Sequence, residues 1–362
     1  MRPCLLLNDF NGGGAERLVK DLAVELDQRN DVDPVVVASN RRGELEEAFE
    51  ESGVELSVLG VDVAIASVGN GTARLLSRLR ELDVDVVHSH LAFSDLVGRL
   101  ACLGLSLPHV STYHNVEEKR PPLKRAVEHA TRPLSEQIVC VSDGVRQSYG
   151  NDPRMRVIYN AIDVEAFNGR VAAADPANVP KRVQSAETVF LNVARCVDVK
   201  RQWDLISAME RLDAPDAHLV VVGDGPLRSD LEAIVSEKGL SESVTITGFV
   251  DSIEPYYACA DAFVSSSSKE GLPTTHIEAM AAELPVISTD IPGVREIVEH
   301  DTTGYLCPVG EPETLAGTMQ RIHGKDCRHL ADRGYQTAMS TFSMERVAAE
   351  HASLYWEVAG DS

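Results

Sequence analysis

The sequence contains no hydrophobic run that approaches the roughly 18 residues needed for a membrane-spanning helix. The apolar run nearest the start, residues 4–7, is four residues long, and no small-residue cleavage site follows it. It therefore predicts a buried strand and not a signal peptide. These absences indicate a soluble protein, or at most a peripheral one at the cytoplasmic face of a membrane.

Cysteine pairs with the spacing of a metal or redox site are also absent. The 7 cysteines are odd in number and scattered, and no pair has the C-x-x-C spacing. They are expected to be small buried side chains in a reducing cytoplasm. The predicted location is therefore cytoplasmic.

Positive charge is scarce. The chain has 34 Lys and Arg against 56 Asp and Glu, a net charge of -22, which excludes general nucleic-acid binding because that needs a positive field. Of the basic residues 8 are Lys and 26 are Arg. This pattern favours an acidic, halophile-like surface that stays soluble in high salt. The alternative is an ordinary acidic protein encoded by a GC-rich genome.

Short β-branched runs alternate with helical stretches throughout the chain. Many of them are continuously apolar, as at 219–222, which is typical of parallel strands covered by helices on both faces. The predicted class is α/β, with two doubly wound, parallel-sheet, Rossmann-like domains facing a cleft. The predicted strands are 3–8, 34–39, 55–59, 84–89, 109–114, 137–141, 156–160, 188–194, 218–222, 244–247, 262–266, 285–289 and 304–307.

A length of 362 residues suits two domains, each with its own core. Between Asp163 and Glu187 the pattern breaks into Ala, Asp, Pro and Asn without periodicity, which predicts a linker. The predicted domains are residues 1–165 and 186–342. A last helix at about 343–358 fits either domain, and a return to the first is one option.

Polar residues gather in four loops that follow predicted strands, where a doubly wound fold binds its ligand. In the most informative loop Glu270 follows a strand, and Glu278 lies about one turn into the next helix, for which Thr274 is the expected N-cap. Both carboxylates can face one ligand beside a helix N-terminus that suits a phosphate. The spacing alone fits equally well a solvated Glu270 and a Glu278 that only stabilises its helix.

Arg195 and Lys200 lie on the loop after the strand predicted at 188–194. Two cations that converge there suit a diphosphate, the Arg as a fork and the Lys as a point charge. In a chain this acidic they could equally be paired with surface carboxylates. Spacing favours neither interpretation.

The other two loops lie in the first half. Glycines 12–14 let the backbone approach a ligand with exposed N–H groups, although they do not form the G-x-G-x-x-G fingerprint and a tight turn would also explain them. His114 ends a predicted strand. A lone histidine there is more often structural than catalytic, so His114 is a candidate site residue only because the other three loops also carry candidate residues.

In this order the motifs resemble family four of the retaining glycosyltransferases, which have the GT-B fold and act on nucleotide-sugars. The resemblance covers nearly the whole chain, and the combination is specific although each motif is weak. The motifs are Gly13-Gly14-Ala15-Glu16, the strand end at His114, Val157 to Asp163, Arg195 with Lys200, Val222-Gly223-Asp224-Gly225-Pro226, Thr247 to Val250, Glu270 with Glu278, and Pro285 to Asp290.

The resemblance implies a role for each residue of the donor site. Glu270 would hold hydroxyls of the donor sugar, and Glu278 would hold the ribose hydroxyls. Arg195 and Lys200 would grip the diphosphate and stabilise the charge on the departing nucleotide. Further donor-binding residues that the resemblance implies are Gly271, Leu272 and Pro273.

The resemblance also implies that the predicted domain at 1–165 lies on the acceptor side and that the domain at 186–342 binds the nucleotide-sugar donor. Gly13 and Gly14 would bring backbone amides near the phosphate or the acceptor, and His114 would lie close to the transferring sugar. Phe249 and Val250 would border the base. The resemblance implies a UDP- or GDP-sugar donor, no cofactor and no metal, and no D-x-D pair follows a predicted strand to hold one.

Two positions depart from the family pattern. Arg201 and Glu283 stand where the family usually has Gly, and neither change is expected to disturb the donor site. Two alternatives to a transferase remain open: a nucleotide-sugar 2-epimerase of similar fold, and a non-catalytic module that binds sugar nucleotides or glycans. Arg195, Lys200 and the two glutamates together count against the module, since binding needs no leaving-group stabilisation.

The acceptor is not identified by these motifs. A local basic excess at 117–132 contains Lys119, Arg120, Lys124, Arg125 and Arg132. A solvated helix face would explain it. The sharper hypothesis is peripheral contact with anionic headgroups or with a lipid-linked phosphate acceptor.

Overall fold

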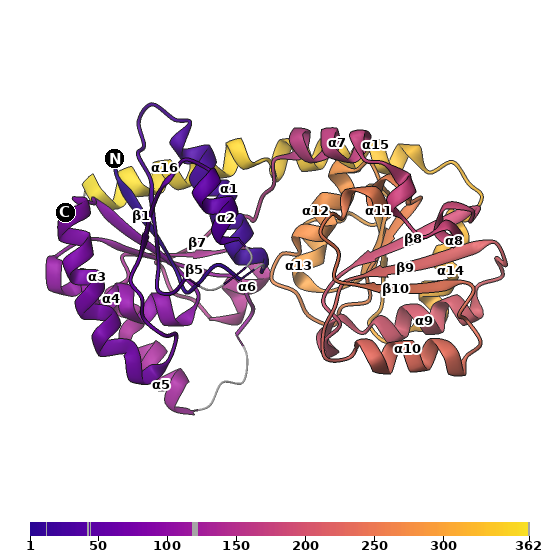
Figure 1. Cartoon of the computed structure of the whole chain (residues 1–362), viewed down its shortest axis with the longest axis horizontal. Helices are drawn as coiled ribbons and strands as arrows, with labels where there is room; N and C mark the ends of the chain where they lie inside the picture. The colour runs from indigo at the N-terminus through magenta and orange to yellow at the C-terminus, as the bar shows by residue number, and fades with distance from the viewer. Residues whose placement is uncertain (12, 42, 44, 118–121, 361–362) are drawn as a thin grey trace. The chain divides into compact units, whose positions relative to one another are not determined.

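The computed structural model describes residues 1–11, 13–41, 43, 45–117 and 122–360. Two compact units divide the chain: Met1–Ala161 with Met344–Ser362, and Ile162–Ser343. Each unit is built on a parallel sheet with helices alongside it (Figure 1). The predicted α/β class with two parallel sheets is confirmed.

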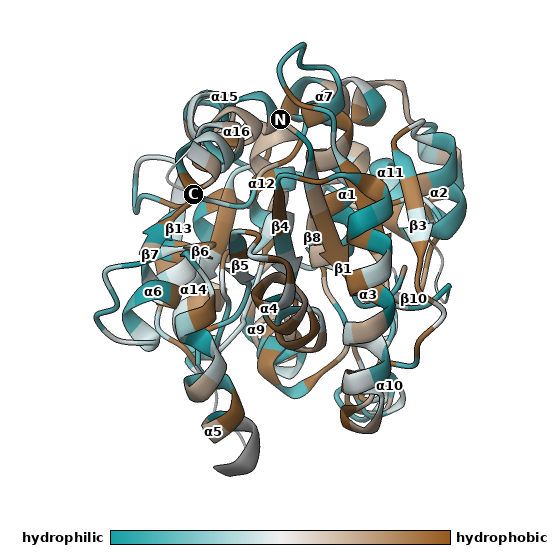
Figure 2. Cartoon of the chain, turned by 90° about the vertical axis from the view of Figure 1, so that its left-hand side faces the viewer, coloured by the Kyte–Doolittle hydropathy of each residue, from teal (hydrophilic) through white to brown (hydrophobic). Residues whose placement is uncertain are grey.

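The first unit contains a seven-stranded parallel sheet within the described residues, in the order β3-β2-β1-β4-β5-β6-β7. Strand β1 (Pro3–Leu7), which lies between β2 and β4, is buried on both faces. Leu5 and Leu7 belong to one hydrophobic cluster, with α1 (Gly14–Asp27), while Cys4 and Leu6 belong to another. Figure 2 shows β1 in brown, as a hydrophobic strand, and the surface helix α2 (Glu46–Glu51) mostly in teal. Because alternate residues of β1 pack into hydrophobic clusters on opposite faces of the sheet, the strand is apolar along its whole length.

The last helix, α16 (Met344–Gly360), belongs to the first unit. It contacts α1 and β4 (Val86–His90), and its Tyr355 is fully buried. The first unit is therefore assembled from both ends of the chain.

The second unit contains a six-stranded parallel sheet among its described residues, in the order β10-β9-β8-β11-β12-β13. One face is covered by α9 (Gln202–Arg211) and α14 (Pro312–Ile322), which contact each other and share a hydrophobic cluster with β8 and β9. Tyr257 of α11 (Glu254–Cys259) and Phe263 of β11 stack with ring centroids 6.4 Å apart. The sheet is thus buried by helices from several parts of the unit.

The linker predicted between Asp163 and Glu187 is wrong as a description of this segment. It begins with helix α7 (Val164–Ala173), whose N-cap Asp163 accepts a hydrogen bond from the Ala166 amide at 2.9 Å. Asn168 Nδ2 donates to the Ala281 carbonyl at 2.8 Å, and α7 contacts α11 and α12. The helix has a weak apolar pattern because small side chains form much of it, so periodicity did not reveal it.

Every predicted strand is present, with ends within about three residues of the prediction. The strands are β1 (Pro3–Leu7), β2 (Val35–Ala38), β3 (Glu55–Val58), β4 (Val86–His90), β5 (His109–Tyr113), β6 (Gln137–Cys140), β7 (Met155–Val157), β8 (Thr188–Val193), β9 (Ala217–Val222), β10 (Val244–Gly248), β11 (Ala262–Val264), β12 (Val286–Thr289) and β13 (Gly304–Cys307). The α-helices not yet given are α3 (Val68–Leu82), α4 (Ala92–Leu105), α5 (Pro122–Thr131), α6 (Asp143–Ser148), α8 (Lys181–Gln184), α10 (Arg228–Glu237), α12 (Thr274–Ala281), α13 (Pro292–Arg295) and α15 (Arg328–Thr341).

Candidate functional site

The candidate donor site of the second unit lies where the strand order reverses. β8 has β9 on one side and β11 on the other. In open α/β sheets, ligands bind beside the carboxyl ends of the strands at such a switch point. The loop after β8 carries Arg195 and Lys200, and the loop after β11 carries Glu270. Two of the four predicted loops are therefore neighbours.

Lys200 and Glu270 form an ion pair across these loops. Lys200 Nζ lies 2.6 Å from Glu270 Oε1, and the side chains are 22% and 13% exposed. Ser267 Oγ donates to the same carboxylate oxygen at 2.6 Å. An ammonium has three N–H donors and a carboxylate has two oxygens, so both groups keep bonding capacity for a ligand. The pair holds both charges in place before any ligand binds.

Serine side chains join the same two loops further. Ser266 Oγ donates to the carbonyls of Lys200 and Arg201, at 3.0 and 2.8 Å. The Ser268 amide donates to the Val199 carbonyl at 2.8 Å. These hydrogen bonds of Ser266 and Ser268 therefore fix the position of the Lys200 loop relative to the Glu270 loop.

Arg195 projects from the start of the β8 loop and is exposed. Within the described part of the chain, its guanidinium forms no ion pair with a carboxylate. Its carbonyl accepts from Gln202 Nε2 at 2.9 Å, which fixes the backbone beneath it. A Cβ at position 225 would lie 2.5 Å from the Cys196 carbonyl oxygen. The absence of a side chain at Gly225 therefore allows the loop after β9 to pack against the Arg195 loop.

Glu278 lies on α12 and is partly buried. The hydroxyl of Tyr257, which is 1% exposed, donates to Glu278 Oε2 at 2.9 Å. Burial, together with the neighbouring Glu278 carboxylate, holds the pKa of Tyr257 well above its usual value. The sequence prediction missed Tyr257, since nothing in the spacing of residues 257 and 278 indicates that they meet.

The expected N-cap at Thr274 is wrong. Helix α12 begins at Thr274 itself, and Pro273 is the N-cap, with extended backbone and no capping side-chain hydrogen bond. The Pro273 side chain has no oxygen, so it cannot accept the hydrogen bond from a first-turn amide that a threonine N-cap would accept. The preceding Gly271 and Leu272 are buried, which makes this loop a packed surface.

Phe249 and Val250 follow β10, and the two strands β9 and β8 lie between β10 and β11. Phe249 is 58% exposed and Val250 is partly buried. A large apolar side chain that is this exposed at a strand end offers a surface to a planar ligand group.

Arg201 and Glu283, the two departures from the family pattern, both have left-handed backbone, with φ of 49° and 56°. Glycine adopts this conformation without the clash that a Cβ introduces. The structure thus gives a physical reason for glycine at these positions. Arg201 Nε donates to Asp204 at 2.7 Å, and its guanidinium lies over the Trp203 ring, so the side chain is held away from Lys200.

In the first unit, Gly13 is the N-cap of α1 and Gly14 is its first residue. A Cβ on Gly13 would lie 2.4 Å from Glu16 Oε2, whereas a Cβ on Gly14 would have open space around it. Glu16 therefore folds back over the glycine loop, and burial raises its pKa. Gly12 lies outside the described residues.

His114 follows β5 at the carboxyl edge of the seven-stranded sheet and is partly buried. Its Nε2 lies 3.1 Å from Nδ1 of His90, the last residue of β4. Burial lowers the pKa of His114 to about 4. The ring is therefore neutral near pH 7 and can form hydrogen bonds but carries no charge.

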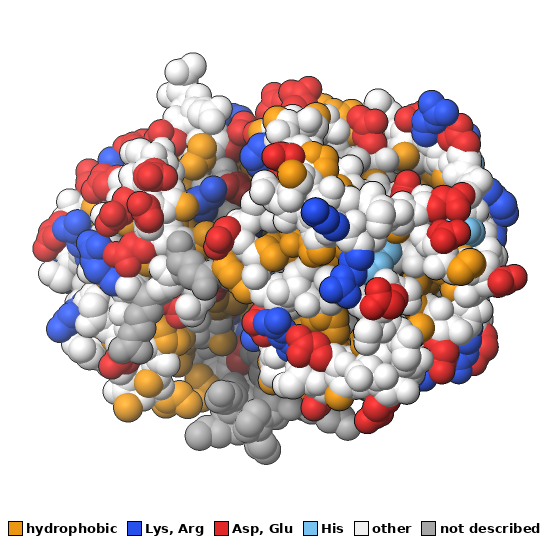
Figure 3. Space-filling model, turned by 45° about the vertical axis from the view of Figure 1, so that its right-hand side comes forward, with side chains coloured by type: hydrophobic (Ala, Val, Ile, Leu, Met, Phe, Trp, Pro, Cys, Tyr) orange, Lys and Arg blue, Asp and Glu red, His pale blue; other side chains and the backbone are white. Residues whose placement is uncertain are grey.

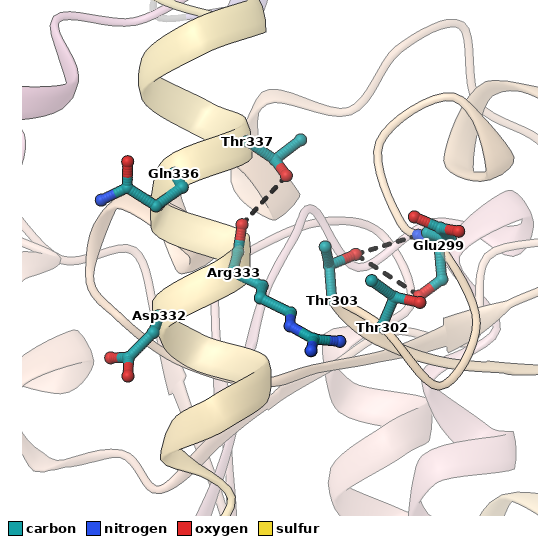
Figure 4. A pocket seen from close by; sticks show the side chains of 7 residues that line it. All are labelled: Glu299, Thr302, Thr303, Asp332, Arg333, Gln336 and Thr337. Atoms are coloured by element: carbon teal, nitrogen blue, oxygen red, sulfur yellow. Dashed lines mark hydrogen bonds between the residues drawn. The ribbon is translucent and has the colours of Figure 1, made fainter.

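A shallow polar pocket of about 340 Å³ lies elsewhere in the second unit (Figure 4). The turn at 299–303 and helix α15 line it, with Arg333 directed between them. This turn precedes β13, at the amino edge of the sheet and away from the switch point. The pocket is therefore separate from the donor loops. No cluster of three or more metal-ligating side chains occurs among the residues that the structure describes.

The basic excess at 117–132 is only partly described. Lys119 and Arg120 lie outside the described residues, and nothing is described of the Lys124 side chain. Arg132 donates to both oxygens of Glu128, at 3.0 and 2.9 Å. No helix of the described chain is both long and apolar enough to cross a membrane.

Acidic and basic side chains are interspersed over the face of the molecule shown in Figure 3. Surface ion pairs of the second unit include Arg211 with Glu313 at 2.8 Å and Arg228 with Glu232 at 2.9 Å. Each such pair joins one acidic and one basic side chain, so the acidic excess, a net charge of -22, is unchanged by pairing.

Two family models match the chain, one in each half. Residues 12–166 match Glycosyltransferase Family 4, and residues 177–337 match Glycosyl transferases group 1. Together the matches cover nearly the whole chain.

Named relatives agree with these matches. An N-acetyl-alpha-D-glucosaminyl L-malate synthase from Bacillus anthracis is 24% identical over 307 residues, 79% of this chain and 79% of the relative. The lipopolysaccharide core biosynthesis glycosyltransferase LpsE of Rhizobium meliloti is 30% identical over 222 residues, 60% of this chain and 63% of its own. The crystal structure of Anabaena HepE in complex with UDP and glucose superposes with a TM-score of 0.86 at 20% identity, covering 99% of this chain and 100% of that one. This likeness confirms the predicted GT-B-like fold.

Proposed function

The chain belongs to the family-4 type of glycosyltransferase, since residues 12–166 match Glycosyltransferase Family 4 and residues 177–337 match Glycosyl transferases group 1, and from this premise we propose that it is a retaining, metal-independent enzyme. Its donor is a UDP- or GDP-sugar, and its acceptor is a hydroxyl or phosphate group, lipid-linked or in a growing glycan. The observation that carries the proposal is the Lys200–Glu270 pair at the switch point of the donor sheet. The UDP and glucose bound by HepE agree with this class of donor.

Lys200 and Arg195 stabilise the departing nucleotide. As the bond to the anomeric carbon breaks, negative charge grows on the diphosphate, and preorganised cations lower that barrier. The contacts of Lys200 with Glu270 fix its ammonium in advance. Arg195, which no described carboxylate neutralises, supplies a two-pronged donor for phosphate oxygens. These cations do the work that a metal ion does in other transferases.

The two glutamates hold parts of the donor that behave differently in the reaction. Glu270 has one carboxylate oxygen bonded to Lys200 and Ser267, and the other accepts hydrogen bonds from hydroxyls of the transferred sugar. Glu278, fixed by Tyr257, accepts from the ribose hydroxyls, which do not change during transfer. Gly271, Leu272 and Pro273 bring the backbone of the same loop to the donor, and Phe249 and Val250 border the base.

The first unit supplies the acceptor side. The backbone amides at Gly13 and Gly14 approach a phosphate or the acceptor, and neutral His114 donates or accepts a hydrogen bond at the transferring sugar. The basic segment at 117–132 makes peripheral contact with a membrane or a lipid-linked acceptor. Catalysis occurs in the cytoplasm.

A donor panel tests the proposal. The purified protein is incubated with each common UDP- and GDP-sugar, and the melting temperature and slow hydrolysis are followed. One donor is expected to raise the melting temperature and to be hydrolysed with its α-configuration retained, at the same rate in EDTA. Loss of most activity in EDTA, recovered with Mn²⁺ or Mg²⁺, would contradict metal independence, and an inverted product would contradict retention.

The two alternatives are an epimerase and a non-catalytic module. The named relatives support neither, because one is a synthase and the other is a glycosyltransferase. The same panel separates them. An epimerase would release free nucleotide and an epimerised sugar without acceptor, and a binding module would be stabilised by the donor without turning it over.

A further inference from the structure

Three histidine rings of the first unit lie in a row. His88 and His90 belong to β4, and His114 follows the neighbouring strand β5. The ring centroids of His88 and His90 are 4.3 Å apart, and those of His90 and His114 are 5.3 Å apart. Because β4 and β5 are parallel neighbours, the row ends at the carboxyl edge of the sheet, where His114 is partly exposed.

At the inner side of the row, His88 also lies next to the buried His351 of α16, with ring centroids 5.3 Å apart, and the ring of His88 is fixed by two hydrogen bonds. His88 lies 2.7 Å from the Tyr355 hydroxyl through Nδ1 and 2.6 Å from Thr112 Oγ1 through Nε2. Both ring nitrogens of His88 are thus used, and the ring has no freedom to turn. Tyr355 comes from α16, so the last helix of the chain helps to hold this histidine.

His90 is the middle ring and is 1% exposed. Its Nδ1 contacts His114 Nε2 at 3.1 Å, and its Nε2 has no hydrogen-bond partner among the described residues. Burial and the neighbouring histidines hold the pKa of His90 well below its usual value, so the ring is neutral. In a pair of neutral imidazoles one nitrogen must donate and the other accept. The tautomers of the two rings are therefore linked: a proton on Nδ1 of His90 places the proton of His114 on its Nδ1, and a proton on Nε2 of His90 places it on Nε2 of His114.

We propose that His90 is a positioning residue, which fixes the ring orientation and the tautomer of His114 for its contact with the transferring sugar. This inference rests on the proposed function, because it assigns His90 a purpose only if His114 acts in transfer. His90 itself is too deeply buried to touch a substrate. Its effect passes through a single hydrogen bond, so it belongs in the turnover step and not in donor affinity.

Two substitutions at one position test the proposal. His90→Leu fills the space and removes the hydrogen bond, whereas His90→Asn places an amide that can donate or accept near the position of Nδ1. We expect His90→Leu to lower kcat by about ten- to a hundredfold with donor KM within about twofold of wild type. His90→Asn is expected to restore kcat to within about threefold of wild type. Equal kcat in His90→Leu and wild type would overturn the inference, and so would a loss that His90→Asn does not restore.

A matched control separates positioning from general damage to the sheet. His109 is equally buried in β5, and its ring nitrogens lie near Ser89 and Ser135 at 2.8 and 3.0 Å. His109→Asn is expected to lower the melting temperature while kcat stays near the wild-type value. A kcat loss in His109→Asn as large as that of His90→Leu would overturn the specific role of His90.

Long-range ¹H–¹⁵N spectra of the wild-type enzyme give a test that needs no variant. At pH 7 we expect His114 to show a single neutral tautomer, and rapid averaging of both tautomers would overturn the inference. His114→Ala separates this failure from that of the proposed function. If His114→Ala keeps wild-type kcat, the role proposed for His114 is wrong. If it loses turnover while His90→Leu does not, only the role of His90 is wrong.

Discussion

Replacing Gly293 by Ala tests whether the loop that holds Glu270 must lie where the structure places it. Gly293 is buried in α13, and a Cβ on it would lie 2.1 Å from the carbonyl oxygen of Gly271 and 3.0 Å from that of Glu270. Real Cβ atoms essentially never come closer than 3.0 Å to a neighbour, so backbone must shift by about 1 Å. No flexible side chain is available to absorb the change, because both neighbours are backbone.

A displacement of this size at a group that orients the reacting sugar costs about 10²-fold in rate. We therefore expect Gly293→Ala to lower kcat about a hundredfold. Overpacking in a buried site destabilises by about 1–3 kcal/mol, and each kcal/mol lowers the melting temperature of a domain this size by about 2–4 °C. The assays are steady-state transfer with the donor found in the panel, run well below the melting temperature, and a thermal melt of the same sample.

Gly317→Ala is the matched control. Gly317 lies in α14, and a Cβ there would have nothing within 4 Å. Because Ala favours a helix interior over Gly by about 1 kcal/mol, this variant is expected to melt slightly higher with unchanged kcat. Wild-type turnover in Gly293→Ala, or an equal loss in Gly317→Ala, would refute the reasoning that the Gly271 carbonyl limits the site.

Four further outcomes are expected. Glu278→Ala should mainly raise donor KM, since it removes binding that the ground and transition states share, whereas Glu270→Ala and Arg195→Ala should lower kcat. Wild-type turnover in both Glu variants would leave the site assignment without support. Tyr257→Phe should raise donor KM by less than Glu278→Ala does, and a kcat effect alone would contradict its role in holding that carboxylate. The melting temperature should rise markedly between 0.1 and 2 M KCl because salt screens the charge of -22, and a flat response would favour the ordinary acidic protein. The free energy of unfolding should fall steeply below about pH 6.5. At those pH values the histidines that the fold holds neutral bind protons only in the unfolded chain, and each lowers the stability by about 1.4 kcal/mol per pH unit. An acid-unfolding midpoint below about pH 4 would contradict this expectation. These histidines, all with pKa lowered mainly by burial, are His88, His90, His109, His114, His218, His276 and His351.

The strands could be read from the sequence because a parallel strand buried on both faces leaves a continuous apolar run. The predicted run at 218–222 became β9 with one residue added. Helix α7 was not found, because its small side chains and its N-cap Asp163 look the same as a solvated linker. Its burial comes from α11 and α12, which are about 90 and 110 residues further along the chain.

For the candidate site, sequence order indicated the loops but not the contacts between them. Lys200 and Glu270 are 70 positions apart, and the two were assigned separate ligand groups with no contact expected. The pairing of His90 with His114 follows from the parallel alignment of β4 and β5, which only the sheet order shows. Spacing along one chain reports neighbours on one element, whereas these contacts depend on which strands are adjacent.

The return of α16 to the first unit has a consequence for how the protein is made. A ribosome finishes the whole second unit, Ile162–Ser343, before it adds the helix that completes the first. Until then the apolar face formed by residues such as Leu5, Leu7 and Leu22 lacks the partners that α16 brings, among them Val347 and Leu354. His88 likewise lacks its hydrogen-bond partner Tyr355 until α16 has been synthesised. The half that is synthesised first is therefore the half that matures last, and a nascent chain stalled before Met344 would present an unfinished core to chaperones and proteases.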